Sequence, residues 1–296
     1  MRLAVFNSFP YHYEMFAHIL DYCKNHNQEV NVYTNTTNDY GWLSYYEEVY
    51  AVKEWYPIHQ FHPEDYDCVI LATDDDYAYG RFWNGKTHVV VIEHGGRRQL
   101  SLPAQSFIQT RQLKLRTPPS DPNTWAIPVW DNKLYTKSDR LTVVSVGRSA
   151  PRDPRELQRM FSNFDDIHFI WIDRTVSCST GVSNIEVIRG MDTENMVKCI
   201  GEATYILLLP NGNDDYVYHT ISASIPLGYS VGTPVLMLEP WVEAYELPGL
   251  IGIPDDSSIE LTHPTAEQCD AFQKGRTELL ERRDRVLTEA MLNHST

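Results

Sequence analysis

The sequence predicts an α/β protein built from two Rossmann-like domains that face each other across a cleft. Short apolar runs alternate with helix-type periodicity in both halves of the chain. Several of these runs are apolar on both faces, as the strands of a parallel sheet must be when helices cover both sides. The 296 residues suffice for two domains that each bury a core.

The first domain, predicted over residues 1–125, has four short apolar runs bounded by polar residues. These expected strands are Arg2–Phe6, Glu29–Tyr33, Cys68–Thr73 and His88–Ile92. Tyr11–His26 places its apolar residues on one helical face, so it is expected to be a helix. Tyr40–Phe61 is rich in Tyr and Trp and is expected to be irregular.

A proline-rich stretch, Gln112–Arg140, has no periodicity and is expected to link the domains. The second domain, predicted over residues 126–296, then repeats the alternation. Its expected strands are Leu141–Val146, Ile167–Ile172, Ile185–Val187, Tyr205–Leu209 and Pro234–Leu238. Its expected helices are Asp153–Phe161, Asp192–Ile200, one starting near Ser222, and Thr265–Met291, which is expected to return to the first domain.

Composition excludes several classes of function. The formal net charge of −15 argues against nucleic acid or an anionic membrane as the main partner. Five scattered cysteines without CxxC spacing indicate a reducing compartment and no zinc site. The first residues are typical of a β-strand rather than a signal peptide, and no apolar run reaches membrane-spanning length. We therefore expect a soluble cytoplasmic protein of open oligomeric state.

The loop after Leu141–Val146 contains a candidate phosphate site. Gly147 allows a sharp turn, and Arg148 and Arg152 are forked donors suited to a phosphate group. The loop after Tyr205–Leu209 leads to Ser222 and Ser224 at an expected helix start, where free N–H groups and the helix dipole favour an anion. The alternatives are arginines paired with nearby carboxylates and serines that only cap the helix.

In its order of motifs, the second half resembles the carboxyl-terminal half of GT-B glycosyltransferases of the glycogen-synthase and sucrose-synthase type. The matching segments are "VSVGR", "NIEVIRGMDTENMVKCIGEATYILLLPN" and "SIPLGYSVGTPVL". The short, Tyr-rich chain is also similar to compact glycosyltransferases of large algal DNA viruses. The resemblance implies a nucleotide-sugar donor, with UDP favoured over GDP, and no cofactor or metal.

The resemblance assigns roles to several residues of the second half. It implies that the donor diphosphate is held by Gly147 and Arg148, with Arg152 or Arg155 in place of the usual Lys. The full nucleotide-sugar set is Gly147, Arg148, Arg152, Arg189, Gly190, Met191, Asn211, Ser222 and Ser224. The family has two Glu eight positions apart, where this chain has His219 and Leu227. Ser222, Ser224 or Glu239 would then have to bind the ribose.

Three loops of the first half follow expected strands, and the carboxyl ends of such strands form ligand sites in α/β proteins. The expected acceptor-binding residues in the first two loops are Asn7, Ser8, His12, Asp74, Asp76 and Tyr77. The expected catalytic residues are His94, Glu93 and Asp75. His94 occupies the place of a donor-sugar contact in similar enzymes. Glu93 is alternatively a structural carboxylate beside Arg97, and the Asp triple is alternatively a solvated loop or a DxD-like metal site.

These observations predict a metal-independent glycosyltransferase that moves a sugar from a nucleotide-diphosphate-sugar to a glycan or other hydroxyl acceptor. Arg148, Arg152 and the helix start would stabilise the departing diphosphate. Inversion would require a side-chain base, whereas retention, which the resemblance favours, would not. Two alternatives stay open: an epimerase or phosphorylase acting on nucleotide-sugars, and a non-catalytic two-domain protein that binds a small ligand.

Overall fold

The computed structural model describes residues 1–9, 12–35, 39–74, 77–93, 106–110, 124–147, 155–173, 182–208, 221–254 and 258–292. The chain divides into two compact units. Unit 1 contains Met1–Trp130, His219–Ile221 and Leu279–Thr296, and unit 2 contains Asp131–Tyr218 and Ser222–Glu278. The division falls within the long helix α8 (Ala266–Leu292), so that its last part groups with unit 1.

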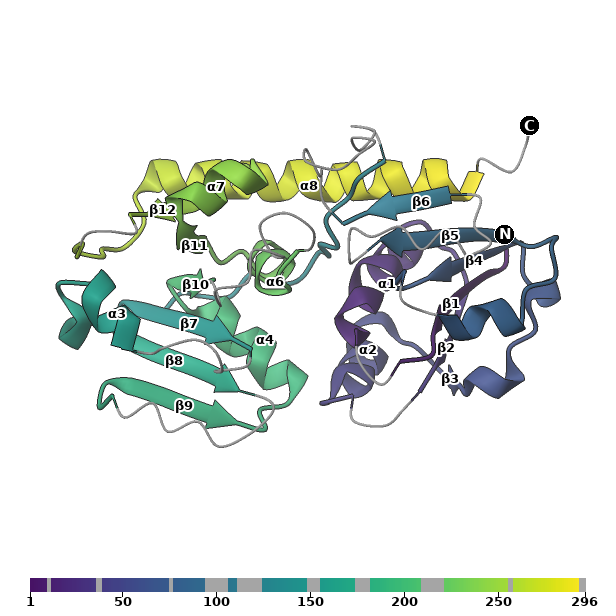
Figure 1. The fold of residues 1–296 in the computed structure, drawn as a ribbon, viewed down its shortest axis with the longest axis horizontal. Helices are drawn as coiled ribbons and strands as arrows, with labels where there is room; N and C mark the ends of the chain where they lie inside the picture. Colours follow the sequence, from purple (N-terminus) through teal and green to yellow (C-terminus); the bar gives the residue numbers. More distant parts are fainter. Residues whose placement is uncertain are drawn as a thin grey trace. The chain divides into compact units, whose positions relative to one another are not determined.

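Unit 1 is built on a six-stranded parallel sheet in the order β3-β2-β1-β4-β5-β6 (Figure 1). Its strands are β1 (Leu3–Asn7), β2 (Val30–Thr34), β3 (Trp55–Tyr56), β4 (Cys68–Leu71), β5 (His88–Glu93) and β6 (Ser106–Gln109). Its helices are α1 (Phe16–Asn25), α2 (Trp42–Tyr50) and the short 3-10 helices η1 (Tyr13–Met15), η2 (Ile58–Gln60), η3 (Pro63–Asp65) and η4 (Tyr77–Arg81).

Successive residues of each strand in unit 1 point to opposite faces of the sheet, and both faces are packed with buried apolar side chains. Phe6, Leu71 and Val91 point into an aromatic cluster with residues of η2 to η4, including Phe61 and Tyr79. The neighbouring positions, Val5 and Ile70 among them, are equally buried on the opposite face. Strands covered in this way are apolar at successive positions, which is the pattern that predicted them.

Unit 2 repeats the plan with a parallel sheet in the order β12-β11-β10-β7-β8-β9. Its strands are β7 (Thr142–Val146), β8 (His168–Asp173), β9 (Ile185–Arg189), β10 (Tyr205–Leu207), β11 (Val235–Leu238) and β12 (Ile251–Ile253). Its helices are α3 (Arg155–Met160), η5 (Phe164–Asp166), α4 (Thr193–Glu202), α6 (Ser224–Val231), α7 (Glu239–Tyr245) and the first part of α8.

One face of the unit 2 sheet packs on a cluster that includes Leu157, Phe161 and Trp171. The opposite face is covered by α4 and α6, which pack together. Gly228 brings α6 against the sheet, since a Cβ at this position would come within 2.6 Å of Val235 Cγ2 and 2.9 Å of Ile206 Cγ2. The missing side chain at this position therefore allows the close approach of helix to sheet.

The expectation that Tyr40–Phe61 is irregular is wrong in part, because this range contains α2 and β3. Trp42 and Tyr46 lie one helical turn apart and their rings stack at 5.4 Å between centroids. Both side chains are buried. Aromatic residues have low helix propensity, so tertiary packing rather than local preference stabilises this helix.

Candidate functional site

Both sheets place a topological switch point beside their first strand. Counted from the first strand of each unit, the strand order is 3-2-1-4-5-6 in both sheets. Chain connections run to opposite sides of the first and fourth strands, and ligands of open α/β sheets bind outside the carboxyl ends of such strands. The relevant loops follow β1 and β4 in unit 1, and β7 and β10 in unit 2.

In unit 2, the loop after β7 begins with the turn at Gly147. This residue has φ of 123°, a value that side-chain-bearing residues rarely adopt. Its N–H donates to Ile172 O at 3.1 Å, and Trp171 Nε1–H donates to its carbonyl oxygen at 3.3 Å. The neighbouring strand β8 thus holds the turn that leads to Arg148. Arg148 and Arg152 themselves lie outside the described residues.

The segment after β10 leads to α6, and β10 is hydrogen-bonded to β7 as a parallel neighbour. The two loops expected to share a diphosphate therefore follow adjacent strands. Helix α6 begins at Ser224, two residues after the expected Ser222, and its N-cap residue Ala223 makes no side-chain capping bond. Ser222 and Ser224 are both buried, and the Ser222 hydroxyl accepts a hydrogen bond from the Ser224 N–H at 3.4 Å. Asn211 lies outside the described residues.

The residues proposed to contact the ribose differ in their surroundings. Leu227 is buried inside α6, at the position where the resembling family has Glu. Glu239 follows the carboxyl end of β11 as the first residue of α7, where a carboxylate is favoured by the helix dipole. It is exposed, and its Cγ would lie 2.8 Å from a Cβ added at Gly252.

The third expected donor segment, Arg189 to Met191, connects the edge strand β9 to α4. Gly190 adopts φ of 64°, and the Asp192 carboxylate caps α4 by accepting from Asn195 N–H at 2.8 Å. Gly190, Met191 and Asp192 lie at a cavity of about 520 Å³ within unit 2. The cavity also contacts α4 through Lys198 and Glu202, so its lining combines charged groups with apolar residues such as Ile188.

Lys137 precedes β7 in the chain, and its side chain is hydrogen-bonded near the carboxyl end of α4. It donates to Gly201 O at 2.8 Å and to Thr233 Oγ1 at 2.6 Å. Burial lowers the pKa of this lysine to about 8. Its contacts fix the chain entering β7, so its role is structural positioning of unit 2.

In unit 1, buried polar side chains gather where the strands end. Asn7 ends β1, Asp74 follows β4 and Glu93 ends β5, and each is at most 1% exposed. Ser8 follows Asn7, and His12 Nδ1 lies 3.3 Å from Glu14 Oε1. Tyr77 begins η4. Asp75, Asp76 and His94 lie outside the described residues, and no contact of the expected acceptor set identifies its ligand.

Several buried polar residues at strand ends were not expected from the sequence. Thr34, Thr73 and Gln109 occupy such positions in unit 1, and Asp173 ends β8 beside Arg189 of β9 in unit 2. The sequence pattern that marks these residues is that each is among the first polar residues after an apolar run. Applying that criterion to every strand would have found them.

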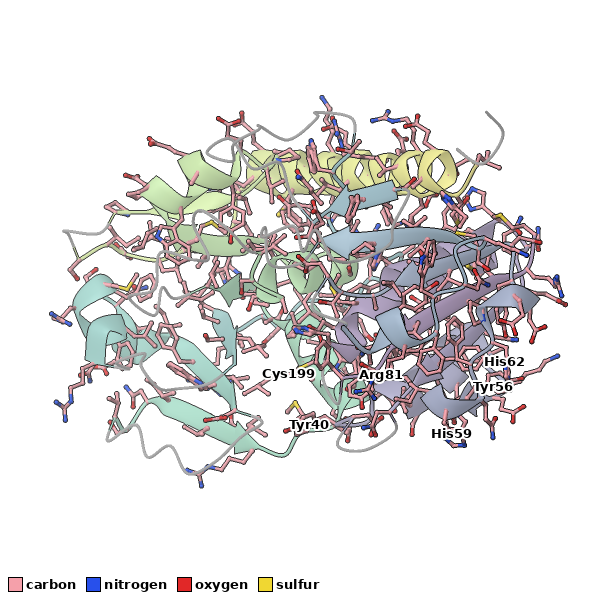
Figure 2. The ribbon with its side chains drawn as sticks, turned by 45° about the vertical axis from the view of Figure 1, so that its right-hand side comes forward. Tyr40, Tyr56, His59, His62, Arg81 and Cys199 are labelled. Carbon is pink, nitrogen blue, oxygen red and sulfur yellow. The ribbon has the colours of Figure 1, made fainter. Side chains whose placement is uncertain are left out.

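Three histidines outside these loops, His59, His62 and His168, lie wholly or partly at the surface. His59 and His62 are exposed near β3 (Figure 2), and His168 Nε2 lies 2.9 Å from Glu186 Oε2. Within the described ranges, no three His, Cys, Asp or Glu side chains are grouped to hold a metal ion. No described helix is both long and apolar enough to cross a membrane.

Comparison with known proteins identifies the fold. No protein-family model matches the chain, and no curated protein matches it by sequence. An α-glucosyltransferase in complex with UDP and a 13-mer DNA containing an HMU base matches with a TM-score of 0.58 and 11% identity, over 99% of this chain and 95% of that one. A glycosyltransferase of avilamycin A biosynthesis matches with a TM-score of 0.57 and 13% identity, over 98% and 97% of the two chains.

A third similar structure, from Listeria monocytogenes, is described as a UDP-N-acetylglucosamine 2-epimerase. Its TM-score is 0.54 at 15% identity, over 97% of this chain and 90% of that one. This chain has the GT-B fold. Its two parallel sheets and its near-complete coverage of these glycosyltransferase structures confirm the predicted class of two Rossmann-like α/β domains. At these identities the likeness extends to the fold alone.

Proposed function

We propose that this chain is a glycosyltransferase that moves a sugar from a nucleotide-diphosphate-sugar to a hydroxyl group of a glycan or other acceptor. The observation that carries the proposal is the Gly147 turn, which β8 holds at the switch point of unit 2. Arg148 follows this turn directly, and the neighbouring strand β10 leads to the start of α6. Forked Arg donors and a helix N-terminus are the groups that bind a diphosphate.

The reaction requires that the acceptor oxygen bond to the anomeric carbon while the bond from that carbon to the diphosphate oxygen breaks. The electron pair of the broken bond goes to the diphosphate, and Arg148, Arg152 and the N-terminus of α6 stabilise this charge. The acceptor proton goes to a diphosphate oxygen in a retaining reaction. In an inverting reaction it goes to a side chain, for which His94, Glu93 and Asp75 are the candidates.

The donor is a UDP-sugar in preference to a GDP-sugar. The α-glucosyltransferase of similar fold is in complex with UDP, and another similar structure, from Anabaena, contains UDP and glucose. Arg189, Gly190 and Met191 would contact the base, and Ser222, Ser224 or Glu239 would contact the ribose. Transfer is expected without a metal ion.

The test combines nucleotide binding with turnover. UDP should raise the melting temperature of the protein, and UDP-sugars should be hydrolysed slowly without acceptor and faster with one. Arg148→Ala should weaken UDP binding by about tenfold or more, because a charge-assisted pair contributes about 1.5–3 kcal/mol. Arg140→Ala is the matched control, since Arg140 is exposed and precedes the opposite end of the same strand, β7. Equal UDP affinity in both variants would exclude the diphosphate role of Arg148.

An epimerase is the second candidate, favoured by the similar fold of the Listeria protein. An epimerase acts on the nucleotide-sugar without transferring its sugar to a second substrate. Incubating each UDP-sugar alone and resolving the products separates the two functions. A new UDP-sugar epimer would support the epimerase, whereas free sugar and UDP would support a transferase that leaks to water. UDP binding without either product would support a non-catalytic binding protein.

A further inference from the structure

Two residues of unit 1 have a backbone conformation that their position in the fold does not explain. Among the described residues, five other than glycine have positive φ. Three of these follow helices, where a left-handed residue normally ends the helix: Asn27, Ala51 and Glu246. His12 with φ of 64° and Tyr40 with φ of 54° instead precede helices. Histidine enters this region more readily than most residues, whereas a bulky tyrosine there is an outlier that marks stored strain.

His12 and Tyr40 lie in corresponding loops of neighbouring strands. His12 is in the loop after β1, Tyr40 is in the loop after β2, and β1 and β2 are parallel partners. Both loops therefore leave the carboxyl edge of the sheet. The loop after β1 borders the switch point of the sheet, and the loop after β2 is its neighbour at the same edge. The strained Tyr40 therefore lies next to the expected ligand loops of unit 1.

Hydrogen bonds connect the two loops to each other and to helix α2. The Tyr13 hydroxyl donates to Asn35 O, and the Tyr46 hydroxyl of α2 donates to Tyr13 O at 2.8 Å. Tyr13 and Tyr46 are buried, and burial raises the pKa of Tyr13 to about 12, so its hydroxyl keeps its proton. Asp39 fixes the second loop by accepting from Leu43 N–H of α2 at 2.9 Å.

Tyr40 stands out because its side chain is 44% exposed in an aromatic-rich unit whose neighbouring rings are buried. It is labelled in Figure 2. Trp42 and Tyr46, which follow it in α2, are at most 4% exposed. Tyr40 lies between Asp39, which is bonded to α2, and the start of that helix. An exposed ring held in this way loses little conformational freedom when a ligand stacks on it, which is the general advantage of a preorganised contact.

The charge of the two loops restricts the ligand. Residues 7–16 and 34–42 contain no Lys or Arg, whereas Glu14 and Asp39 are acidic. A nucleic-acid ligand requires cations that neutralise its phosphates, and the chain as a whole has a net charge of −15. An uncharged ligand with an apolar face and several hydroxyl groups suits loops that carry an aromatic ring, an imidazole and carboxylates.

We propose that Tyr40 is the stacking platform of the acceptor site, with His12 in the loop of the neighbouring strand, and that the acceptor is a neutral sugar rather than a nucleic acid. This inference rests on the proposed glycosyltransferase function. It departs from the similar α-glucosyltransferase that is in complex with DNA. The backbone at Tyr40 holds the ring at the edge of the sheet, and the hydroxyl groups of the sugar bond to the polar side chains there.

The test uses the full-length protein with UDP-sugars and two kinds of acceptor. The first is a panel of neutral p-nitrophenyl glycosides, and the second is a 13-mer duplex DNA that contains hydroxymethyluracil. Wild-type protein should accept at least one glycoside and not the DNA. Transfer to DNA, or to no glycoside while UDP-sugar is still hydrolysed, would overturn the acceptor class. Loss of both UDP binding and hydrolysis would instead overturn the proposed function.

Tyr40 variants then test the platform. Tyr40→Ala and Tyr40→Gly should both raise the KM for the accepted glycoside about tenfold, with the KM for UDP-sugar changed less than about twofold. Tyr40→Phe should keep the wild-type KM because the ring remains. Ala51→Gly is the matched control, since Ala51 has φ of 53° in a loop at the other edge of the sheet. A glycoside KM in Tyr40→Ala within about twofold of wild type would overturn the platform.

Discussion

Replacing Gly147 by alanine tests the turn on which the donor site depends. The allowed left-handed region for side-chain-bearing residues ends near φ of about 70°, whereas Gly147 has φ of 123°. An alanine must therefore either keep a strained conformation or rotate toward the allowed region. Both outcomes have a cost that follows from the contacts of this residue.

If the turn keeps its shape, the strain costs about 1–3 kcal/mol. If the turn rotates, it loses the bond from its N–H to Ile172 O and the bond from Trp171 Nε1 to its carbonyl oxygen. Each such bond contributes about 0.5–1.5 kcal/mol, so this route costs about 1–3 kcal/mol as well. Rotation would also change the direction in which the chain leaves the turn toward Arg148.

We expect Gly147→Ala to lower the free energy of unfolding by about 1–3 kcal/mol. Where rotation displaces Arg148, the same free energy corresponds to a loss of UDP affinity of about five- to hundredfold. Urea unfolding and calorimetric titration with UDP measure the two effects. Gly85→Ala is the control, because Gly85 has φ of 73° and no atom within 4 Å of an added Cβ. Equal behaviour of the two variants in both assays would refute the reasoning.

Three further predictions concern packing and buried charge. Gly228→Ala should lower the free energy of unfolding by about 1–3 kcal/mol, because the added Cβ would come within 2.6 Å of Val235 Cγ2. Displacement of α6 should also reduce the rise in melting temperature that UDP causes. An unchanged melting temperature of the variant would contradict this prediction. Arg283→Met should lower the free energy of unfolding, measured with urea, by about 3–5 kcal/mol, because it removes the guanidinium 2.5 Å from the buried Asp21 carboxylate. Adding Asp21→Leu to this variant should restore most of the lost stability. Burial and the nearby Arg283 lower the pKa of His18 to about 3, so the unfolded state binds more protons below about pH 6.5. Stability should fall as the pH falls from 6.5 toward 3, and His18→Leu should reduce that slope.

The sequence was sufficient to predict the strands that lie inside each sheet. β1, β4, β7 and β8 are apolar on both faces, and this pattern follows from being covered on both sides. The edge strand β3 has only two residues, both half-buried, so it has no periodicity to recognise. β6 and β12 escaped prediction for a similar reason, since edge strands of three or four residues give too short a pattern.

The candidate site was predictable to the extent that it is local in sequence. Gly147 was recognised because a glycine directly after an apolar run indicates a turn, and its φ of 123° agrees. The buried pair of Arg283 and Asp21 was not recognised, because its members are 262 positions apart in the chain. Tyr40, which we propose as the acceptor platform, was also not recognised from the sequence. Its distinguishing features are a strained φ and an exposed ring, and neither can be read from residue types.

The two sheets have the same strand order, so the fold alone offers two equivalent ligand edges. The side chains at these edges differ. In unit 2 the first strand ends in a Gly-Arg turn and its neighbour leads to buried hydroxyl groups at a helix start, which suits an anion. In unit 1 the strand ends carry the carboxyl groups of Asp74 and Glu93, whose oxygens suit hydroxyl groups that donate hydrogen bonds. This difference in side-chain chemistry, rather than the topology, supports assigning the donor to unit 2 and the acceptor to unit 1.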